Sequence, residues 1–449
     1  MTAHSALRPL PRRRGVLIGL RETLAYLLNP DGFIAARAEE FGPVFGATLF
    51  FRPTAVIGGP LAVEEFVASE RAITESSLPA AFTALHTPYG ALNQSGVRHR
   101  ATRAGYQPLF QINALESYLP VLTRTITGFT DRIASEGHTH IARDGKLLCL
   151  NLFAELFAGE ALSYDELEAF NTYNGALLSL STWLPSFRRG MGALKLLQQR
   201  MTQRLERFRQ GELMSACFSL FASNRDEQDL PWSDERIATA TILLIWGAYI
   251  EVASLMASAL ILSENKPDVR ERILLEAAQQ GLADRSAIGT LAQWALPYTQ
   301  GVVRESLRLN PPAGGGFRRA SDDIAIAGFR IPAGTVITAD PRIGNRQPSL
   351  YPESDVFQPE RWIQRDGASS RCPFAGSAAV LPKGAWFPGG IGSHSCPGIP
   401  LAELCGRMFL VRWMQVIKTW RQPEGCSAAI PYTLVPIKIP SDSYQLLVE

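Results

Sequence analysis

Cys396 is the residue of this sequence whose setting is best suited to chemistry. It closes a glycine-rich loop within AWFPGGIGSHSCPGIPLAELCGRMF (385–409), directly before a predicted helix in whose first turn Pro397 and Pro400 are well tolerated. A sulfur in this position faces backbone N–H groups and the positive end of the helix dipole, both of which favour the thiolate. A lone thiolate of this kind suits heme iron better than zinc. This segment alone leaves open an ordinary loop cysteine among turn-forming glycines.

Glu251 is a second candidate, because it is the single charged residue in the apolar stretch ATATILLIWGAYIEVASLMASALIL (238–262). By its length the stretch could cross a bilayer. Its acid lies near the centre, however, where a membrane penalises charge. A helix that is apolar all round also fits the interior of a large soluble protein, and we favour this interpretation. In either setting Glu251 is buried, and a buried carboxyl group requires an explanation.

The elements that must position these two residues are mainly helical. Helical patterns dominate from about 114 to 309, and a further helix is predicted over about 399–420. Residues 42–59, rich in Val, Phe and Thr between glycines, predict a hairpin. Residues 324–338 predict extended chain with two turns. A Pro-rich irregular segment, 340–395, leads into the cysteine loop, and irregular segments of this length usually carry function.

Composition limits the class of protein. The chain of 449 residues is 46% hydrophobic and can bury a large core, and its net charge of +2 gives no electrostatic reason to expect nucleic acid as a partner. Six scattered cysteines without a CxxC pair favour a reducing compartment. Residues 1–30 contain a basic cluster but no cleavage site after their short apolar run. We therefore expect an N-terminal arm on a soluble, cytoplasmic protein without a transmembrane anchor.

Two further motifs lie between the apolar stretch and the cysteine. Glu305 and Arg308 can pair on one face of a helix that ends at Asn310, although such a pair is by itself usually solvated. FQPERW (357–362) follows about fifty residues later, just over thirty before the cysteine. This order and spacing resembles the cytochrome P450 family over nearly the whole chain. The segments GGGFRRASDDIAIAGFRIPAG and LYPESDVFQPERW look closest to soluble bacterial relatives of the retinoid hydroxylases.

The resemblance implies a fold and a cofactor. The fold is mainly α with small β-sheets: a triangular helical body plus a β-rich subdomain, with heme b (iron protoporphyrin IX) between a distal and a proximal helix. It implies one domain over 1–449. Cys396 matches the axial ligand of the iron, where an anionic sulfur favours O–O cleavage. Glu305, Arg308 and Arg361 match the structural triad that braces the cysteine loop.

The resemblance also implies partners for the two heme propionates. These are His99 and Arg103, four apart on a predicted helix, Arg318 on a strand, and His394 two residues before the cysteine. Three neighbouring arginines are expected to be solvated instead: Arg98, Arg100 and Arg319.

This sequence departs from the family pattern in two places. Relatives usually carry Phe seven residues before the cysteine. Here that position is Gly389, and Phe387 lies nine before, so Phe387 or Trp386 is expected to shield the sulfur differently. On the distal helix, relatives carry an acid–alcohol pair in a pattern like Ala-Gly-x-Glu-Thr. This chain reads Gly-Ala-Tyr-Ile-Glu, so that Ile250 replaces the acid and Glu251 replaces the threonine.

Glu251 therefore occupies the position of a threonine that normally helps deliver protons to bound dioxygen. A carboxylate there could instead move a proton between the two oxygens of a peroxide, as a glutamate does in heme-thiolate peroxygenases of unrelated fold. Burial among Trp246, Ile250 and Val252 is expected to raise its pKa, which suits a proton shuttle. Two other roles stay open, a hydrogen bond to a water on this helix and binding of a substrate amine.

The leading hypothesis for function is oxidation of an apolar small molecule such as a terpenoid or lipid-like metabolite, most simply by hydroxylation. Ala248, Ala313 and Phe317 are the expected substrate-lining residues. The oxidant is dioxygen with electrons from a separate ferredoxin- or flavodoxin-type donor, or hydrogen peroxide. A second class is an isomerase, lyase or dehydratase that needs no external electrons. A third is a heme-binding carrier without turnover.

Overall fold

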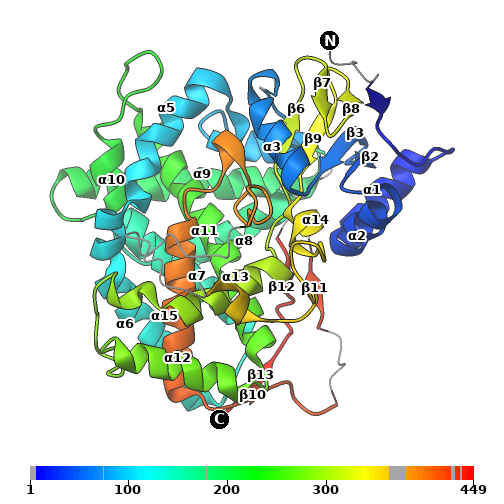
Figure 1. The fold of residues 1–449 in the computed structure, drawn as a ribbon. Helices are drawn as coiled ribbons and strands as arrows, with labels where there is room; N and C mark the ends of the chain where they lie inside the picture. Colours follow the sequence, from blue (N-terminus) through cyan, green and yellow to red (C-terminus); the bar gives the residue numbers. More distant parts are fainter. Residues whose placement is uncertain are drawn as a thin grey trace. The chain divides into compact units, whose positions relative to one another are not determined.

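The computed structural model describes residues 7–73, 75–177, 179, 181–363, 381–425, 430–434 and 437–449. They divide into two compact units (Figure 1). Unit 1 is formed by stretches within 1–99, 313–356 and 381–396. Unit 2 is formed by stretches within 100–312, 357–380 and 397–449.

Unit 1 is built around a five-stranded sheet with the order β2-β3-β9-β6-β4. Strands β2 and β3 pair antiparallel with Val44 opposite Ile57, and β3 runs parallel to β9. A second sheet has the order β1-β8-β7. The strands are β1 Arg8–Pro9, β2 Val44–Leu49, β3 Arg52–Ile57, β4 Glu75–Ser76, β6 Phe317–Arg319, β7 Ile324–Ile326, β8 Phe329–Ile331 and β9 Val336–Ala339. The helices are α1 Ile18–Leu28, α2 Pro30–Phe41, α3 Pro60–Ala68, α4 Ala80–Leu85 and α14 Pro341–Asn345, with short 3-10 turns at Glu70–Ala72, Ala91–Asn93 and Gly392–His394.

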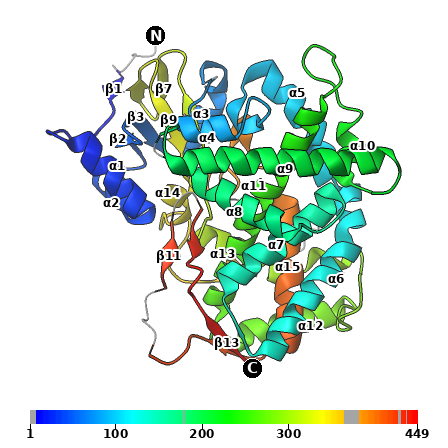
Figure 2. The same ribbon diagram turned by 180° about the vertical axis from the view of Figure 1, so that it is seen from behind.

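Unit 2 is mainly helical, and α9 packs on both α8 and α11 (Figure 2). Its helices are α6 Ile112–Glu136, α7 Ile141–Ala158, α8 Tyr164–Ala176, α9 Pro185–Arg209, α10 Ala216–Phe221, α11 Asp234–Ser263, α12 Pro267–Gln279, α13 Pro297–Leu309 and α15 Ile399–Val416. Short 3-10 turns are η3 Gln107–Phe110, η4 Gln293–Ala295 and η5 Pro359–Trp362. Two small sheets join β10 Trp420–Arg421, β13 Leu446–Val448 and β5 His138–Thr139, and β11 Tyr432–Thr433 with β12 Ile439–Pro440. Helix α5, Gly96–Tyr106, contains the boundary between the units.

The predicted apolar helix is α11, and it is the central helix of unit 2. The Ser233 hydroxyl accepts a hydrogen bond from the Arg236 N–H at its start, and Asp234 lies in its first turn, where acids are favoured. The helix is long and apolar enough to cross a membrane, but 72% of its most apolar window is buried within the protein. The interpretation as a buried core helix agrees with this packing.

Most predicted elements agree with the structure, and one predicted end is wrong. The hairpin of 42–59 is β2 and β3, and the two turns of 324–338 separate β7, β8 and β9. The last helix was predicted to reach about residue 420, but it ends at Val416. The following backbone instead pairs with the C-terminal strand, with Trp420 opposite Val448. The N-terminal segment is also more than an arm, because β1 pairs with β8 and α1 packs on β2.

Candidate functional site

The cysteine loop of unit 1 exposes Cys396 on a hydrogen-bonded turn. The Cys396 N–H donates to the carbonyl of Gly389 at 2.7 Å, and Gly390 and Gly392 adopt φ values of 77° and 73° that favour glycine. Phe387 is buried in the apolar core of unit 1. Helix α15 begins at Ile399, so that Pro400 lies in its first turn and Pro397 precedes it. Shielding of the sulfur by Phe387 or Trp386 stays a prediction.

Three of the residues predicted to bind propionates lie together in unit 1. The imidazoles of His99 and His394 stack with their ring centres 3.8 Å apart and 12° between their planes. Arg318 Nη1 donates to Nδ1 of His394 at 2.6 Å. The Nε2 of His394 lies 3.0 Å from the carbonyl oxygen of Gln94. Because a guanidinium only donates, His394 accepts at Nδ1 and carries its proton on Nε2.

The buried guanidinium of Arg318 is the charged centre of this cluster. It is 8% exposed, and burial lowers its pKa while the carboxylate of Glu70, 3.8 Å away, raises it. Its Nε is buried without a hydrogen-bond partner among the described residues. A buried donor that lacks an acceptor is costly. The Arg318 guanidinium, whose Nε–H is still available to donate, therefore fits a carboxylate ligand at this cluster.

The other arginines of this region lie as follows. Arg103, one turn after His99 on α5, stands over the ring of Tyr106 at 5.9 Å. Arg100 and Arg319 are exposed, as expected. Arg98 is partly buried, so its expected solvation stays a prediction. The propionate roles of His99, Arg103, Arg318 and His394 stay predictions.

The predicted triad of unit 2 is a buried hydrogen-bonded cluster around Glu305. Both Glu305 and Arg308 are 0% exposed, and Arg308 donates to the two carboxylate oxygens at 2.8 and 2.7 Å. Arg361 Nε donates to the same carboxylate at 3.0 Å. A solvated surface pair, which the spacing alone suggested, is excluded by this burial. The role of the triad in bracing the cysteine loop stays a prediction.

The sequence did not reveal all partners of the Glu305 carboxylate. Trp362 Nε1 donates to it at 2.8 Å, and the Gln358 N–H donates at 3.0 Å. Both residues belong to the FQPERW segment. The motif therefore identified the segment, but it did not show that these two groups donate to Glu305. A second buried pair, Arg304 Nε with Glu403 at 2.8 Å, joins α13 to α15 and had no sequence signal.

Gly301 allows η5 to lie against α13, and replacing it tests this packing. A Cβ at Gly301 would lie 2.6 Å from the carbonyl oxygen of Pro359, which is backbone and cannot rotate away. We expect Gly301→Ala to lower the free energy of unfolding by about 1–3 kcal/mol, measured by denaturant unfolding. Gly128→Ala on α6, where nothing lies within 4 Å, is the control and should be neutral or stabilising. Equal losses in both variants would contradict the close approach.

The middle of α11 presents one accessible stripe on an otherwise buried stretch. Leu244, Gly247, Ala248 and Glu251 are at least partly accessible, whereas Tyr249 and Ile250 between them are buried. The spacing of these four residues places them on one face of the helix. After Glu251 every residue to Leu260 is buried. Glu251 therefore lies at the C-terminal end of an accessible apolar stripe and is the carboxyl group of that stripe.

The Glu251 carboxyl has an unusual electrostatic setting. Burial raises its pKa from 4.5 to about 7. Among the described residues, no group forms a hydrogen bond or an ion pair with this carboxyl to offset the burial. A carboxyl that titrates near neutrality can both donate and accept a proton. The structure thus agrees with the predicted rise in the pKa, while the role of Glu251 stays a prediction.

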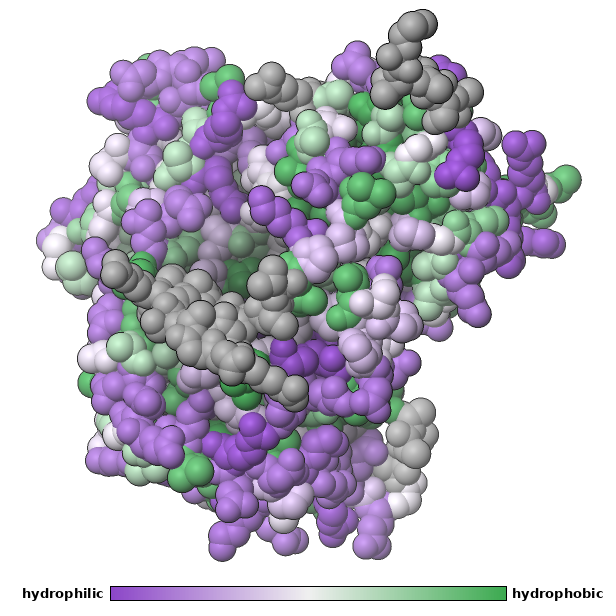
Figure 3. Space-filling view, viewed as in Figure 1, coloured by the Kyte–Doolittle hydropathy of each residue, from purple (hydrophilic) through white to green (hydrophobic). Residues whose placement is uncertain are grey.

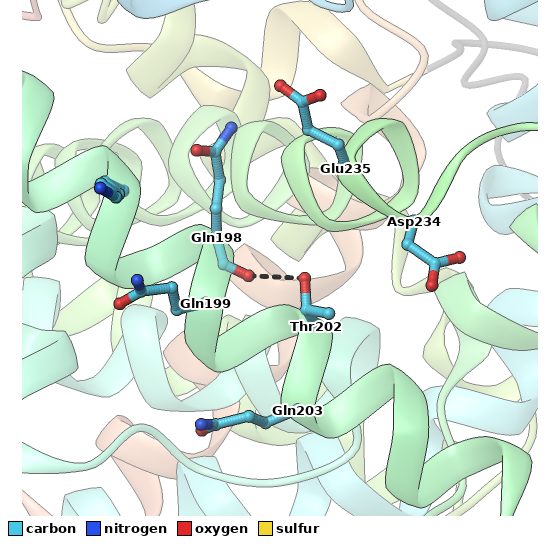
Figure 4. Close-up of a pocket in the computed structure, with 7 residues that line it drawn as sticks. Gln198, Gln199, Thr202, Gln203, Asp234 and Glu235 are labelled. Atoms are coloured by element: carbon cyan, nitrogen blue, oxygen red, sulfur yellow. Dashed lines mark hydrogen bonds between the residues drawn. The ribbon is translucent and has the colours of Figure 1, made fainter.

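The remaining predicted lining residues, Ala313 and Phe317, are partly buried in unit 1. The ring of Phe317 packs edge-on against Phe50 at 5.5 Å, so it also supports the sheet. In unit 2, an open groove runs between α9 and the start of α11 (Figure 4). None of the predicted site residues lines this groove. Its lining residues are Lys195, Gln198, Gln199, Thr202, Gln203, Asp234 and Glu235.

Comparisons with known proteins cover both units. The family model for cytochrome P450 matches residues 11–447. The putative cytochrome P450 120 of Synechocystis is 28% identical over 91% of this chain and 90% of its own length. Mouse cytochrome P450 26B1 is 25% identical over 97% of this chain and 85% of its own. The solved structure of cyanobacterial CYP120A1 with retinoic acid bound superposes on this chain with a TM-score of 0.85. The two sequences are 27% identical, and the match covers 99% of this chain and 100% of the CYP120A1 chain. This chain therefore belongs to the cytochrome P450 family.

Proposed function

We propose that this cytochrome P450 oxidises a lipophilic small molecule, most simply by hydroxylation, and that Glu251 is the group that transfers protons. The observation that carries the proposal is the stripe on α11, where a carboxyl with a pKa of about 7 follows three accessible apolar positions. A substrate lying along Leu244 and Ala248 would have its reacting end close to the only titratable group of the stripe. The apolar positions would exclude water from the substrate.

Heme is the cofactor of the family, and when bound it supplies the oxidising centre. We propose Cys396 as its ligand, with Arg318, His99 and His394 holding the propionates and Arg103 assisting. The buried Nε of Arg318, which lacks an acceptor among the described residues, supports this assignment. Arg318 donates to the neutral imidazole of His394 in this structure. A carboxylate at the cluster would offer the guanidinium a charged acceptor, and charge-assisted hydrogen bonds are the stronger ones.

The substrate is proposed to be a largely hydrocarbon molecule of terpenoid or lipid-like character. Accessible residues on the α11 stripe before Glu251 are small or aliphatic, and Ala313 and Phe317 are the proposed lining residues of unit 1. A retinoic acid molecule is bound in the cyanobacterial relative, which supports an extended isoprenoid as the first compound to test.

The proton donor and acceptor properties of Glu251 bear on the oxidant. A carboxyl with a pKa near 7 is divided between its two protonation states at neutral pH, so it can take a proton from hydrogen peroxide and return it to the departing oxygen. Dioxygen with a separate ferredoxin- or flavodoxin-type donor is the other route. It would use Glu251 as a proton donor only.

Rapid mixing of the ferric holoprotein with hydrogen peroxide tests the proposal. Wild type is expected to give a fast change in heme absorbance, and Glu251→Gln, which keeps the size and loses the titratable proton, should be slower by about a hundredfold. Glu235→Gln, exposed at the start of the same helix, is the matched control and should react like wild type. Equally slow bleaching in all three proteins would sink the peroxide route, and turnover should then be sought with an electron donor.

An isomerase, lyase or dehydratase that needs no external electrons is the second candidate function. By the family pattern, Ile250 stands where relatives carry the acid and Glu251 where they carry the alcohol, and this difference supports the second candidate. Product analysis without oxidant or reductant separates the two functions. A rearranged product under these conditions would favour this second function, and no turnover would favour oxidation.

A further inference from the structure

We propose that the leucine face of α1, together with the arginines beside it, docks unit 1 onto the surface of an anionic lipid bilayer. The leucine face is defined as Leu17, Leu20, Leu24 and Leu28. This inference is independent of the proposed chemistry, because it rests on residues outside the candidate site.

Helix α1 carries its leucines on the side that faces away from the core of unit 1. Its buried side joins Tyr26, which packs in the apolar core, to two polar residues. Glu22 accepts from the Thr48 N–H at 2.8 Å and pairs with Arg37, and Thr23 donates to the Thr48 carbonyl. The opposite side presents leucines, and Leu20, Leu24 and Leu28 are 43%, 46% and 76% exposed. A helix on a soluble protein normally turns its apolar face to the core. The folding of unit 1 therefore does not account for these leucines.

The hairpin that packs against α1 also exposes a strained aromatic residue. The β2–β3 hairpin turns through Phe50 and Phe51, which have φ values of 49° and 60°. Two-residue turns of this kind favour Asn-Gly, because bulky residues are strained at positive φ. The ring of Phe50 packs on Tyr26, whereas Phe51 is 60% exposed and its N–H donates to Thr23 on α1. The exposed ring of Phe51 makes little packing contact, so burial of this side chain does not offset the backbone strain of its positive φ.

The charges around the leucine face favour anionic lipid over a neutral surface. Arg12, Arg13, Arg14 and Arg21 are exposed within the same segment. Arg13 pairs with Glu40 at 2.7 Å, which leaves three arginines with no ion pair to a described residue. Figure 3 shows green and purple side chains next to each other at the α1 edge of this unit. Exposed aliphatic and aromatic side chains flanked by arginines are the pattern of helices that lie in the bilayer interface.

Co-sedimentation of the full-length holoprotein with vesicles tests the proposal. Wild type is expected to bind vesicles of phosphatidylcholine with phosphatidylglycerol and to bind pure phosphatidylcholine much less. The variant L20S/L24S/L28S should lower the partition coefficient by about tenfold or more, because each leucine no longer enters the interface. The double variant Arg12→Gln/Arg14→Gln should lower the partition coefficient by a similar factor, because two arginines no longer attract the anionic headgroups.

Two matched variants control for general surface changes. L147S/L230S/L275S removes leucines of similar exposure, 45%, 56% and 57%, from unit 2, and Arg188→Gln/Arg189→Gln removes two exposed arginines from α9. Both should bind like wild type. No binding of wild type to anionic vesicles, or equal binding of L20S/L24S/L28S and wild type, overturns the proposal. A wild-type dimer that dissociates in L20S/L24S/L28S would show that a second copy covers this face, and would also overturn it.

Discussion

Replacing Glu305 with alanine is expected to lower the free energy of unfolding by about 3–5 kcal/mol, the largest effect that we predict. The change leaves the Arg308 guanidinium charged and 0% exposed after both of its carboxylate hydrogen bonds are lost. It also removes the acceptor that Arg361, Trp362 and the backbone N–H of Gln358 share, so one substitution takes a hydrogen bond from each of these donors as well. Denaturant unfolding followed by circular dichroism measures the loss.

Two further variants make this prediction specific. Glu305→Gln keeps the shape of the side chain and one acceptor oxygen, so its free energy of unfolding should fall less than that of Glu305→Ala. It should therefore accumulate as folded protein even if Glu305→Ala does not. Glu360→Gln changes an acid of the same segment that pairs with Arg272 and is 49% exposed, and it should be within about 0.5 kcal/mol of wild type. A Glu305→Ala protein that unfolds at the wild-type midpoint would contradict the buried cluster.

Elements with a strong one-dimensional pattern were predictable from the sequence. The apolar run that includes Glu251 is long and nearly uncharged, and it folds as α11, a helix that the rest of unit 2 largely buries. The β2–β3 hairpin was predicted from residue types, although its turn uses Phe50 and Phe51 instead of Asn-Gly. Tertiary contacts outweigh turn preference there, since Phe50 packs between Tyr26 and Phe317.

Features that depend on contacts distant in sequence were not predictable. The spacing of Glu305 and Arg308 is the same for a solvated pair and a buried one, and only the packing of η5 on α13 makes it buried. The pairing of Arg304 with Glu403 joins residues 99 apart and leaves no local pattern. The orientation of α1 is a related case, because the sequence shows its leucines but not which side of the helix packs on β2.

Within the candidate site, the residue types were predictable but their grouping was not. The family pattern named His99, Arg318 and His394 separately. Their stacking and hydrogen bonding in unit 1 follow from the meeting of α5, β6 and the cysteine loop. The pKa of Glu251 shows the opposite case, because a lone acid in an apolar helix needs no partner to be perturbed.

The second large effect is a pH-dependent gain of stability in Glu251→Gln. The pKa of Glu251 is raised from 4.5 to about 7 in the folded protein, so between these values the folded state holds a proton that the unfolded state has released. Stability of wild type therefore falls as pH rises through this window, and the full cost of the buried carboxylate is present above it. Glutamine carries no such cost. The variant should match wild type near pH 4.5 and exceed it by about 1–3 kcal/mol near pH 8.

Unfolding of both proteins at several pH values measures this difference, with Glu235→Gln as the control on the exposed start of α11. The control should differ from wild type by a constant amount at every pH, because Glu235 is exposed at the start of the helix. Parallel profiles for Glu251→Gln and wild type would mean that water reaches the carboxyl freely. Glu251 would then lose its suitability as a proton shuttle, and peroxide reactivity would need another explanation. A gain confined to high pH, together with slower reaction with peroxide, would assign both effects to the same buried proton.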